Sequence, residues 1–177
     1  MTYIIDFCVI SLAFLMITVI FYLRRVKVPS LRNTLFASLL ICGVVSLVFD
    51  IISASINPFA YRIPTLLVIL ANIIFLGSVQ LSGPLFLFYI MSVTGMQTHT
   101  DRRTRTLICI PFFLIELLLI ASPLLGTHGI FYLDASNSYF TGSCHMLLYL
   151  VASLYILAAL VLTIQNAISC TKRGFLP

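Results

Sequence analysis

The chain has 177 residues, of which 61% are hydrophobic and only 8% charged, and its formal net charge is +5. Soluble domains carry about 25% charged residues, so this composition excludes a water-soluble globular protein. Nucleic-acid binding is not expected either, because the basic residues lie beside long apolar segments, where they interact with lipid headgroups. The composition therefore predicts a membrane protein whose first partner is the lipid bilayer.

Five apolar segments are each long enough to cross the hydrocarbon layer, which requires about 20 helical residues. We expect spans over residues 3–23, 34–55, 65–94, 107–126 and 146–168. Helices are required because a sheet with open edges leaves backbone groups without hydrogen bonds in lipid. The predicted fold class is an all-α polytopic membrane helix bundle with five transmembrane helices, formed by one domain over residues 1–177.

The basic residues predict the orientation of these spans. Nine of the ten fall in three blocks, at residues 24–32, 102–105 and 172–173, and Arg62 is the tenth. Loops that remain in the cytoplasm keep their Lys and Arg, so we expect the N-terminus outside and the C-terminus in the cytoplasm. No basic residue precedes the first apolar segment, which argues against a cleaved signal peptide. The expected location is a multi-pass position in the cell membrane.

The third segment contains the expected bend. Its 30 residues exceed one perpendicular crossing, so the helix must tilt, protrude or bend. Pro84 removes one backbone donor from the helix interior, and we expect a kink of more than about 20° near it. Ser82 and Gly83 are small enough to let a neighbouring helix approach.

Glu116 is the strongest candidate for a functional residue. It lies near the middle of the fourth segment, where an ionised carboxylate is costly unless it is paired or hydrated. We expect it to face the third segment, within reach of Asn72, Ser78 or Gln80. Two interpretations remain open: a neutral carboxyl group that joins two helices, or a group that senses a stimulus, binds a ligand or carries a proton.

Small and polar residues recur at every fourth position of the second segment, which predicts a packing seam on one face of the helix. The residues of this stripe are Ser38, Cys42, Ser46, Asp50 and Ala54. Asp50 and Asn72 lie at similar depths, and Asp6 is shallower. These three side chains either line an outward-opening ligand cavity, or Asp50 and Asn72 form a structural hydrogen bond.

The loop before the fifth segment is the longest polar part of the chain. Residues 130–140 place two aromatic stretches around a Ser/Asn/Asp turn, which favours a short hairpin on the outer surface. An unstructured loop with its aromatic residues anchored in the headgroups is the alternative.

The sequence carries no motif of a known catalytic or metal site. None of the three histidines has a second ligand at metal spacing, so we expect no catalytic residue, no metal and no cofactor. The cysteines form no CxxC pair. A Cys8–Cys144 disulfide is one alternative, and free thiols packed in an apolar interior are the other.

Several landmarks carry a resemblance to a known family. They are residues 32–36 and 48–52 around the second segment, the run from Asn72 through Tyr89 to Gly95, the loop residues 131–134 and 139–142, and Tyr149 and Tyr155. With them the chain resembles the seven-helix N-terminal membrane module of bacterial signalling proteins, which precedes histidine kinase or GGDEF diguanylate cyclase domains. The resemblance implies an input module truncated after five helices, a cytoplasmic output domain as a partner, and a possible homodimer.

The expected function is therefore a membrane-embedded sensory module that regulates a cytoplasmic output domain. Any catalysis would belong to that output domain, because this chain contains no output motif. The first alternative is a subunit of a transporter or permease, although such proteins usually show internal repeats and this sequence shows none. The second is a structural subunit of a membrane assembly.

Overall fold

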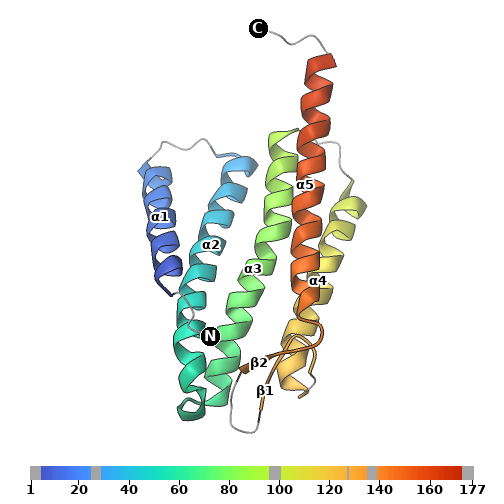
Figure 1. Ribbon diagram of the computed structural model, residues 1–177. Helices are drawn as coiled ribbons and strands as arrows, with labels where there is room; N and C mark the ends of the chain where they lie inside the picture. Colours follow the sequence, from blue (N-terminus) through green and yellow to red (C-terminus); the bar gives the residue numbers. More distant parts are fainter. Residues whose placement is uncertain (1–4, 25–28, 96–100, 127, 135–138, 173–177) are drawn as a thin grey trace.

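The computed structural model describes residues 5–24, 29–95, 101–126, 128–134 and 139–172. Within these residues the long helices are α1 (Ile5–Arg24), α2 (Leu31–Ile56), α3 (Thr65–Val93), α4 (Arg102–Leu124) and α5 (Met146–Lys172) (Figure 1). The short 3-10 helix η1 (Asn57–Arg62) joins α2 to α3, and the strands β1 (Phe131–Leu133) and β2 (Tyr139–Thr141) lie between α4 and α5. All five long helices are long and apolar enough to cross a membrane. The predicted all-α fold of five such helices is confirmed.

The helices α2, α4 and α5 extend beyond the predicted apolar spans at one end or both, whereas α3 ends one residue and α4 two residues before the predicted end. α2 begins at Leu31 because the Ser30 side chain caps it, accepting a hydrogen bond from the Asn33 amide at 3.3 Å. α4 begins at Arg102 rather than at residue 107, and α5 continues to Lys172. Apolar length predicts the part of a helix that fits the hydrocarbon layer, whereas a helix ends where its backbone is capped.

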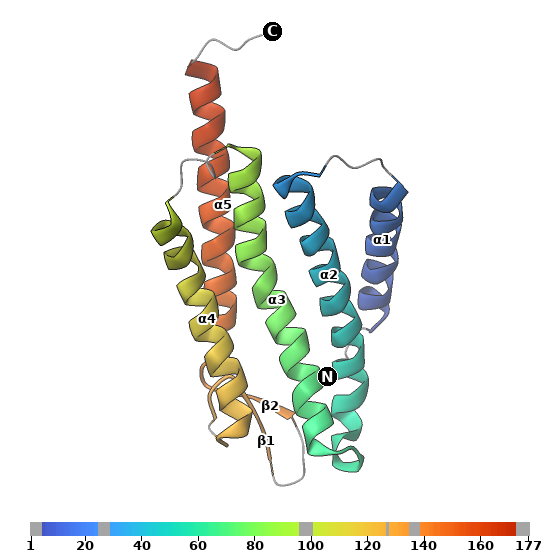
Figure 2. The ribbon, with the colours of Figure 1, turned by 180° about the vertical axis from the view of Figure 1, so that it is seen from behind.

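The bundle is built around α3. α1, α2 and α3 pack in sequence, and α4 and α5 pack against the other side of α3 (Figures 1 and 2). We call the end that carries η1, β1 and β2 the hairpin end, and the opposite end, with Arg24, Arg32 and Arg102, the basic end. α5 extends past the other helices at the basic end (Figure 1).

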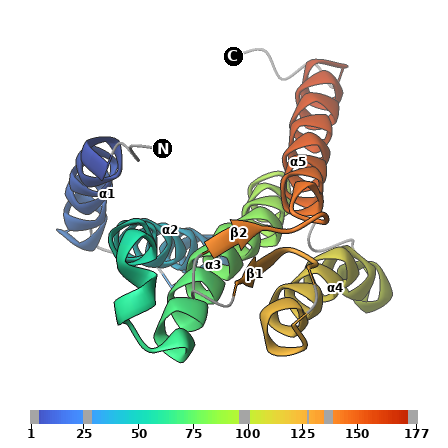
Figure 3. The same ribbon diagram turned by 60° about the horizontal axis from the view of Figure 1, so that its bottom comes forward.

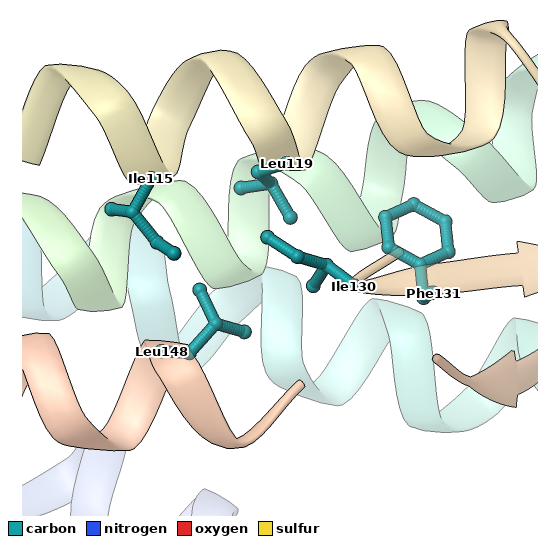
Figure 4. Packing of buried hydrophobic residues seen from close by; sticks show 5 residues of the cluster. All are labelled: Ile115, Leu119, Ile130, Phe131 and Leu148. Carbon is teal, nitrogen blue, oxygen red and sulfur yellow. The ribbon is translucent and has the colours of Figure 1, made fainter. Parts of the chain in front are cut away.

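A hydrophobic cluster at the hairpin end joins α4, α5 and the hairpin. Figure 4 shows its buried members, which are Ile115, Leu119, Ile130, Phe131 and Leu148. Ile73 and Leu76 of α3 pack against them. The cluster holds the hairpin against three helices.

A second contact joins α3, α4 and α5 nearer the basic end. The Tyr155 hydroxyl of α5 donates to the carbonyl oxygen of Ile108 on α4 at 2.6 Å. Its ring lies against Gly83 of α3, where an added Cβ atom would be 3.0 Å from the Tyr155 ring. The expectation that Gly83 lets a neighbouring helix approach is confirmed. α3 is continuous through Pro84, and the size of the bend there stays a prediction.

Candidate functional site

Buried polar side chains join α2 to α3 near the hairpin end. The Ser53 hydroxyl donates to Asn72 Oδ1 at 2.8 Å, and Asn72 Nδ2 donates to Asn57 Oδ1 at 3.1 Å and to the carbonyl oxygen of Val68 at 2.8 Å. Asn72 is 2% exposed. Because protein groups satisfy both ends of its amide, Asn72 serves to pack two helices and is a poor ligand for an outside molecule.

The sequence-based candidates Asp50 and Asp6 lie apart from this network. Asp50 is buried on α2, and its Oδ2 accepts a hydrogen bond from the Cys8 thiol of α1 at 3.1 Å. The predicted hydrogen bond between Asp50 and Asn72 is wrong, since Asn72 pairs with Ser53 and Asn57 instead. Asp6 is exposed on α1. These hydrogen bonds do not join the three side chains to one another, and an outward-opening cavity between them stays a prediction.

The stripe of small residues on α2 is a packing seam, as predicted. Every one of its five residues is buried or half-buried. The Cys42 thiol donates to the carbonyl oxygen of Ser78 on α3 at 3.0 Å, while Asp50 contacts α1. Cys8 and Cys144 form no disulfide bond, so the disulfide alternative is not realised.

We predict that Asn72→Leu lowers the free energy of unfolding by about 1 to 2 kcal/mol, because side-chain hydrogen bonds inside membrane proteins contribute about 0.6 kcal/mol on average and up to about 1.7 kcal/mol. Thermal unfolding in detergent micelles measures the change. Ser55→Ala is the matched control, since the exposed Ser55 hydroxyl bonds only to Ile51 of its own helix. Equal effects of the two substitutions would argue against the network.

Glu116 faces α3, as predicted, but its partners differ from those expected. An added Cβ atom on Gly77 would lie 3.1 Å from Glu116 Oε2 and 3.4 Å from Oε1, so the absence of a side chain at Gly77 makes room for the carboxyl group. Oε1 is buried, and no described residue donates a hydrogen bond to it. The contact between α3 and α4 at this depth is therefore one of close packing.

The predicted hydrogen-bond partners of Glu116 are used elsewhere. The Ser78 hydroxyl donates to the carbonyl oxygen of Phe75 in its own helix at 2.9 Å. Gln80 Nε2 donates to the carbonyl oxygen of Leu148 on α5 at 2.9 Å, and Gln80 is 3% exposed. Gln80 thus ties α3 to α5 and is a packing residue, although its buried Oε1, like Glu116 Oε1, has no donor among the described residues.

We predict that Glu116→Leu leaves the free energy of unfolding unchanged or raises it by up to about 1 kcal/mol, because it removes a buried acceptor whose desolvation is not compensated. Thermal unfolding of the two proteins in the same detergent tests this. A loss of more than about 1 kcal/mol would show that the carboxyl group makes a stabilising hydrogen bond, for example to an internal water molecule.

The loop that follows α4 forms a hairpin, which decides between the two sequence-based alternatives. β1 and β2 are antiparallel, with Tyr132 opposite Phe140, and they lie across the end of the bundle beside α3, α4 and α5 (Figure 3). Ser122 of α4 is 1% exposed and clamps the hairpin. Its hydroxyl donates to the carbonyl oxygen of Phe131 at 2.9 Å and accepts from the Ile130 amide at 3.0 Å.

A polar pocket lies between this hairpin and the ends of α3 and α4. Its volume is about 240 Å³. We call it the hairpin pocket, and its lining residues are Thr65, Ile69, Pro123, Gly126, His128, Tyr132, Leu133 and Asp134. Residues that carry an imidazole, a phenol, a hydroxyl and a carboxylate are among those lining this concave space, together with apolar ones, and such a mixture is found in small-molecule sites.

Aromatic contacts hold the pocket wall in place. The Tyr132 ring lies edge-on to His128, with ring centroids 4.1 Å apart, and stacks on Phe140 at 5.6 Å. Tyr139 stacks on Phe131 at 5.5 Å. Burial, with a smaller effect of nearby Tyr149, raises the pKa of Tyr139 to about 12. Its phenol stays neutral at physiological pH.

Sequence reasoning missed this pocket. It gives His128 no role beyond the lack of a second metal ligand, and it uses residue 65 only as the start of the third span. The pocket joins residues 65–69 to residues 123–134, and no local pattern predicts that contact. Ser122, a polar residue inside the predicted fourth span, was the available signal that α4 meets a polar partner there.

No His, Cys, Asp or Glu cluster of metal-binding size occurs among the residues that the structure describes. Comparisons with protein-family models, with curated proteins and with solved structures found no match.

Proposed function

We propose that the chain is the input module of a membrane signalling protein and that the hairpin pocket binds its stimulus. The observation that carries this proposal is the position of the pocket, whose walls come from α3, α4 and the hairpin together. A ligand that fits one arrangement of these walls better than another shifts the population of the two arrangements.

The contacts around the pocket connect the hairpin to α4 and α5, so a change in the pocket walls is passed on to these helices. Ser122 holds β1 to α4, and the hydrophobic cluster links β1 to Ile115 of α4 and Leu148 of α5. A displacement of β1 must therefore move α4 or strain its packing. Rigid shifts of packed helices by about 1 to 2 Å are a common form of such signalling.

We expect the shift of α4 to occur at its contact with α3. α2 and α3 are fixed to each other by the Asn72 network, and Gln80 fixes α3 to α5. Between α3 and α4, by contrast, the buried Glu116 Oε1 has no donor among the described residues and its carboxyl group rests on Gly77. The Tyr155–Ile108 hydrogen bond ties α4 to α5 nearer the basic end, so a shift of α4 along α3 would have to carry α5 with it or break this bond.

The chemistry of the pocket favours one class of stimulus. Asp134 is an acid, and no Lys or Arg is among the lining residues. We therefore favour a small neutral or positively charged molecule over an anion.

The direction of signalling follows from the charge pattern. The basic blocks predict that the basic end faces the cytoplasm, so the hairpin pocket would face outward and α5 would lead to an output domain. The seven-helix signalling modules that the sequence resembles support this arrangement, with a GGDEF or histidine kinase domain as the output and a homodimer as the assembly. The proposed location is the bacterial cell membrane.

Cysteine labelling tests this orientation. We predict that Asp134→Cys in intact cells reacts with a membrane-impermeant maleimide, whereas Thr104→Cys reacts only after permeabilisation. Both positions are exposed, and the parent chain controls for its five native cysteines. Labelling in the opposite sense would place the pocket in the cytoplasm and would contradict a sensor of external stimuli.

A further inference from the structure

An apolar groove runs between α1 and α2 in the half of the bundle nearer the basic end. Its volume is about 300 Å³. The lining residues include Met16, Val19 and Leu23 of α1 and Ala37, Ile41 and Val44 of α2. Within the described residues α2 is the element against which α1 packs (Figure 2), so one side of the groove is open to the surroundings of the bundle.

Two contacts between α1 and α2 limit how far the helices separate along the groove, although Leu23, Val44 and Val45 line it beyond these contacts. An added Cβ atom on Gly43 would lie 3.1 Å from Leu15, so the helices touch there. The Tyr22 hydroxyl donates to the carbonyl oxygen of Asn33 at 2.7 Å and joins them again near the basic end. Leu15 and Tyr22 are about 10 Å apart along α1 at 1.5 Å per residue.

These two contacts determine which kind of molecule fits into the groove. A helix of a second copy is about 10–12 Å wide with its side chains, and it is too broad to enter between α1 and α2, because the two helices touch at these two points. An extended acyl chain is only one carbon chain wide and matches both the shape and the apolar lining.

Two arginines near the basic end of the groove are suited to bind the phosphate group of such a lipid. Arg24 directly follows the lining residue Leu23 and is exposed, and Arg32 is exposed at the start of α2. Arg32 precedes the lining residue Ala37 by about 7.5 Å at 1.5 Å per residue. Guanidinium groups bind phosphate through paired hydrogen bonds.

We propose that this groove binds an anionic phospholipid, with one acyl chain between α1 and α2 and its phosphate at Arg24 and Arg32. The inference rests on membrane insertion but not on the hairpin pocket, which lies between α3, α4 and the hairpin.

A fluorescence experiment tests the proposal. The chain contains no tryptophan, so Ile41→Trp places a single reporter in the groove wall. Ile110→Trp on α4 is the matched control, since Ile110 is also exposed and lies eight residues from Arg102, near two further arginines. Each protein is reconstituted into phosphatidylcholine vesicles that contain brominated phosphatidylglycerol or brominated phosphatidylcholine, and quenching gives the relative binding constants.

We expect the Ile41→Trp reporter to show a preference for phosphatidylglycerol of about fivefold for each arginine, which corresponds to about 1 kcal/mol per basic residue. The Ile110→Trp reporter should show a smaller preference. Adding Arg24→Gln and Arg32→Gln to the groove reporter should abolish its excess preference. Ala37→Phe, which fills the groove, should abolish it while both arginines remain.

Equal preference at the two reporter positions would overturn the proposal. A preference for phosphatidylglycerol at the groove reporter that survives the loss of both arginines would also overturn the proposal. A preference that survives Ala37→Phe would show attraction to surface charge alone and would also overturn the groove as the binding site.

Discussion

Gly142→Ala is expected to disrupt the hairpin and to lower the free energy of unfolding by about 3 kcal/mol, the upper range for extra atoms forced into a packed site. A methyl group on Gly142 would collide with the carbonyl oxygen of Gly129. The two segments cannot separate easily, because the Gly142 amide donates to Ile130 at 2.7 Å and the Cys144 amide donates to Gly129 at 2.8 Å. The clash is with backbone, which cannot rotate away as a side chain would.

Hydrogen exchange of the Cys144 amide and thermal unfolding in micelles measure this effect. We expect fast exchange and a lower melting temperature in Gly142→Ala. Thr141→Ala is the matched control, because Thr141 is the preceding residue and its side chain is exposed. If Gly142→Ala behaved like this control, the described path of the chain between β2 and α5 would be wrong.

Ser122→Ala is expected to lower the free energy of unfolding by about 2 kcal/mol. The substitution removes two hydrogen bonds and leaves the buried amide of Ile130 without its acceptor, and an unsatisfied buried donor costs about 1 to 3 kcal/mol. Exchange of the Ile130 amide should accelerate with the loss of stability.

Ser143→Ala provides the control for Ser122→Ala. Its hydroxyl donates to the carbonyl oxygen of His128 at 3.1 Å, but the residue is exposed, so water can replace the lost bond. We expect a change of less than about 0.5 kcal/mol, as is usual for surface substitutions. A Ser122→Ala protein as stable as Ser143→Ala would contradict the clamp between α4 and β1.

The architecture was predictable because membrane helices obey simple rules. The length of each apolar segment predicts a span, and the described helices agree with all five. Gly83 and the stripe that contains Cys42 predicted close helix contacts, which Tyr155 and Ser78 supply. Small residues are informative since they let backbones approach one another in lipid.

The partners of individual polar groups were less predictable. Equal depth suggested that Asp50 would meet Asn72, yet Ser53, about one turn further along α2, takes that position. Depth follows from counting residues, whereas the choice of partner depends on how each helix is rotated about its axis. The prediction that Glu116 faces α3 was correct, because a carboxyl group is costly in lipid. Its contact with Gly77 could not be predicted, since it depends on how α3 and α4 are rotated about their axes.

The hairpin pocket could not be predicted from the sequence, for a related reason. Its residues come from the start of α3, the end of α4 and the hairpin. Two of these segments are more than 50 residues apart in the chain, from Thr65 to Pro123, and only the packing of α4 against α3 brings them together.

A distance measurement between α3 and α4 at the basic end tests the proposed signalling most directly. Nitroxide labels at Val93 and Leu107, both exposed, report the separation of the two helices in reconstituted membranes by pulsed electron resonance. We predict that Tyr132→Ala, which removes one wall of the hairpin pocket, shifts this distance distribution, and that Thr141→Ala on the other strand does not. Identical distributions in the parent, Tyr132→Ala and Thr141→Ala would show that the pocket is not coupled to the basic end and would contradict the sensor function.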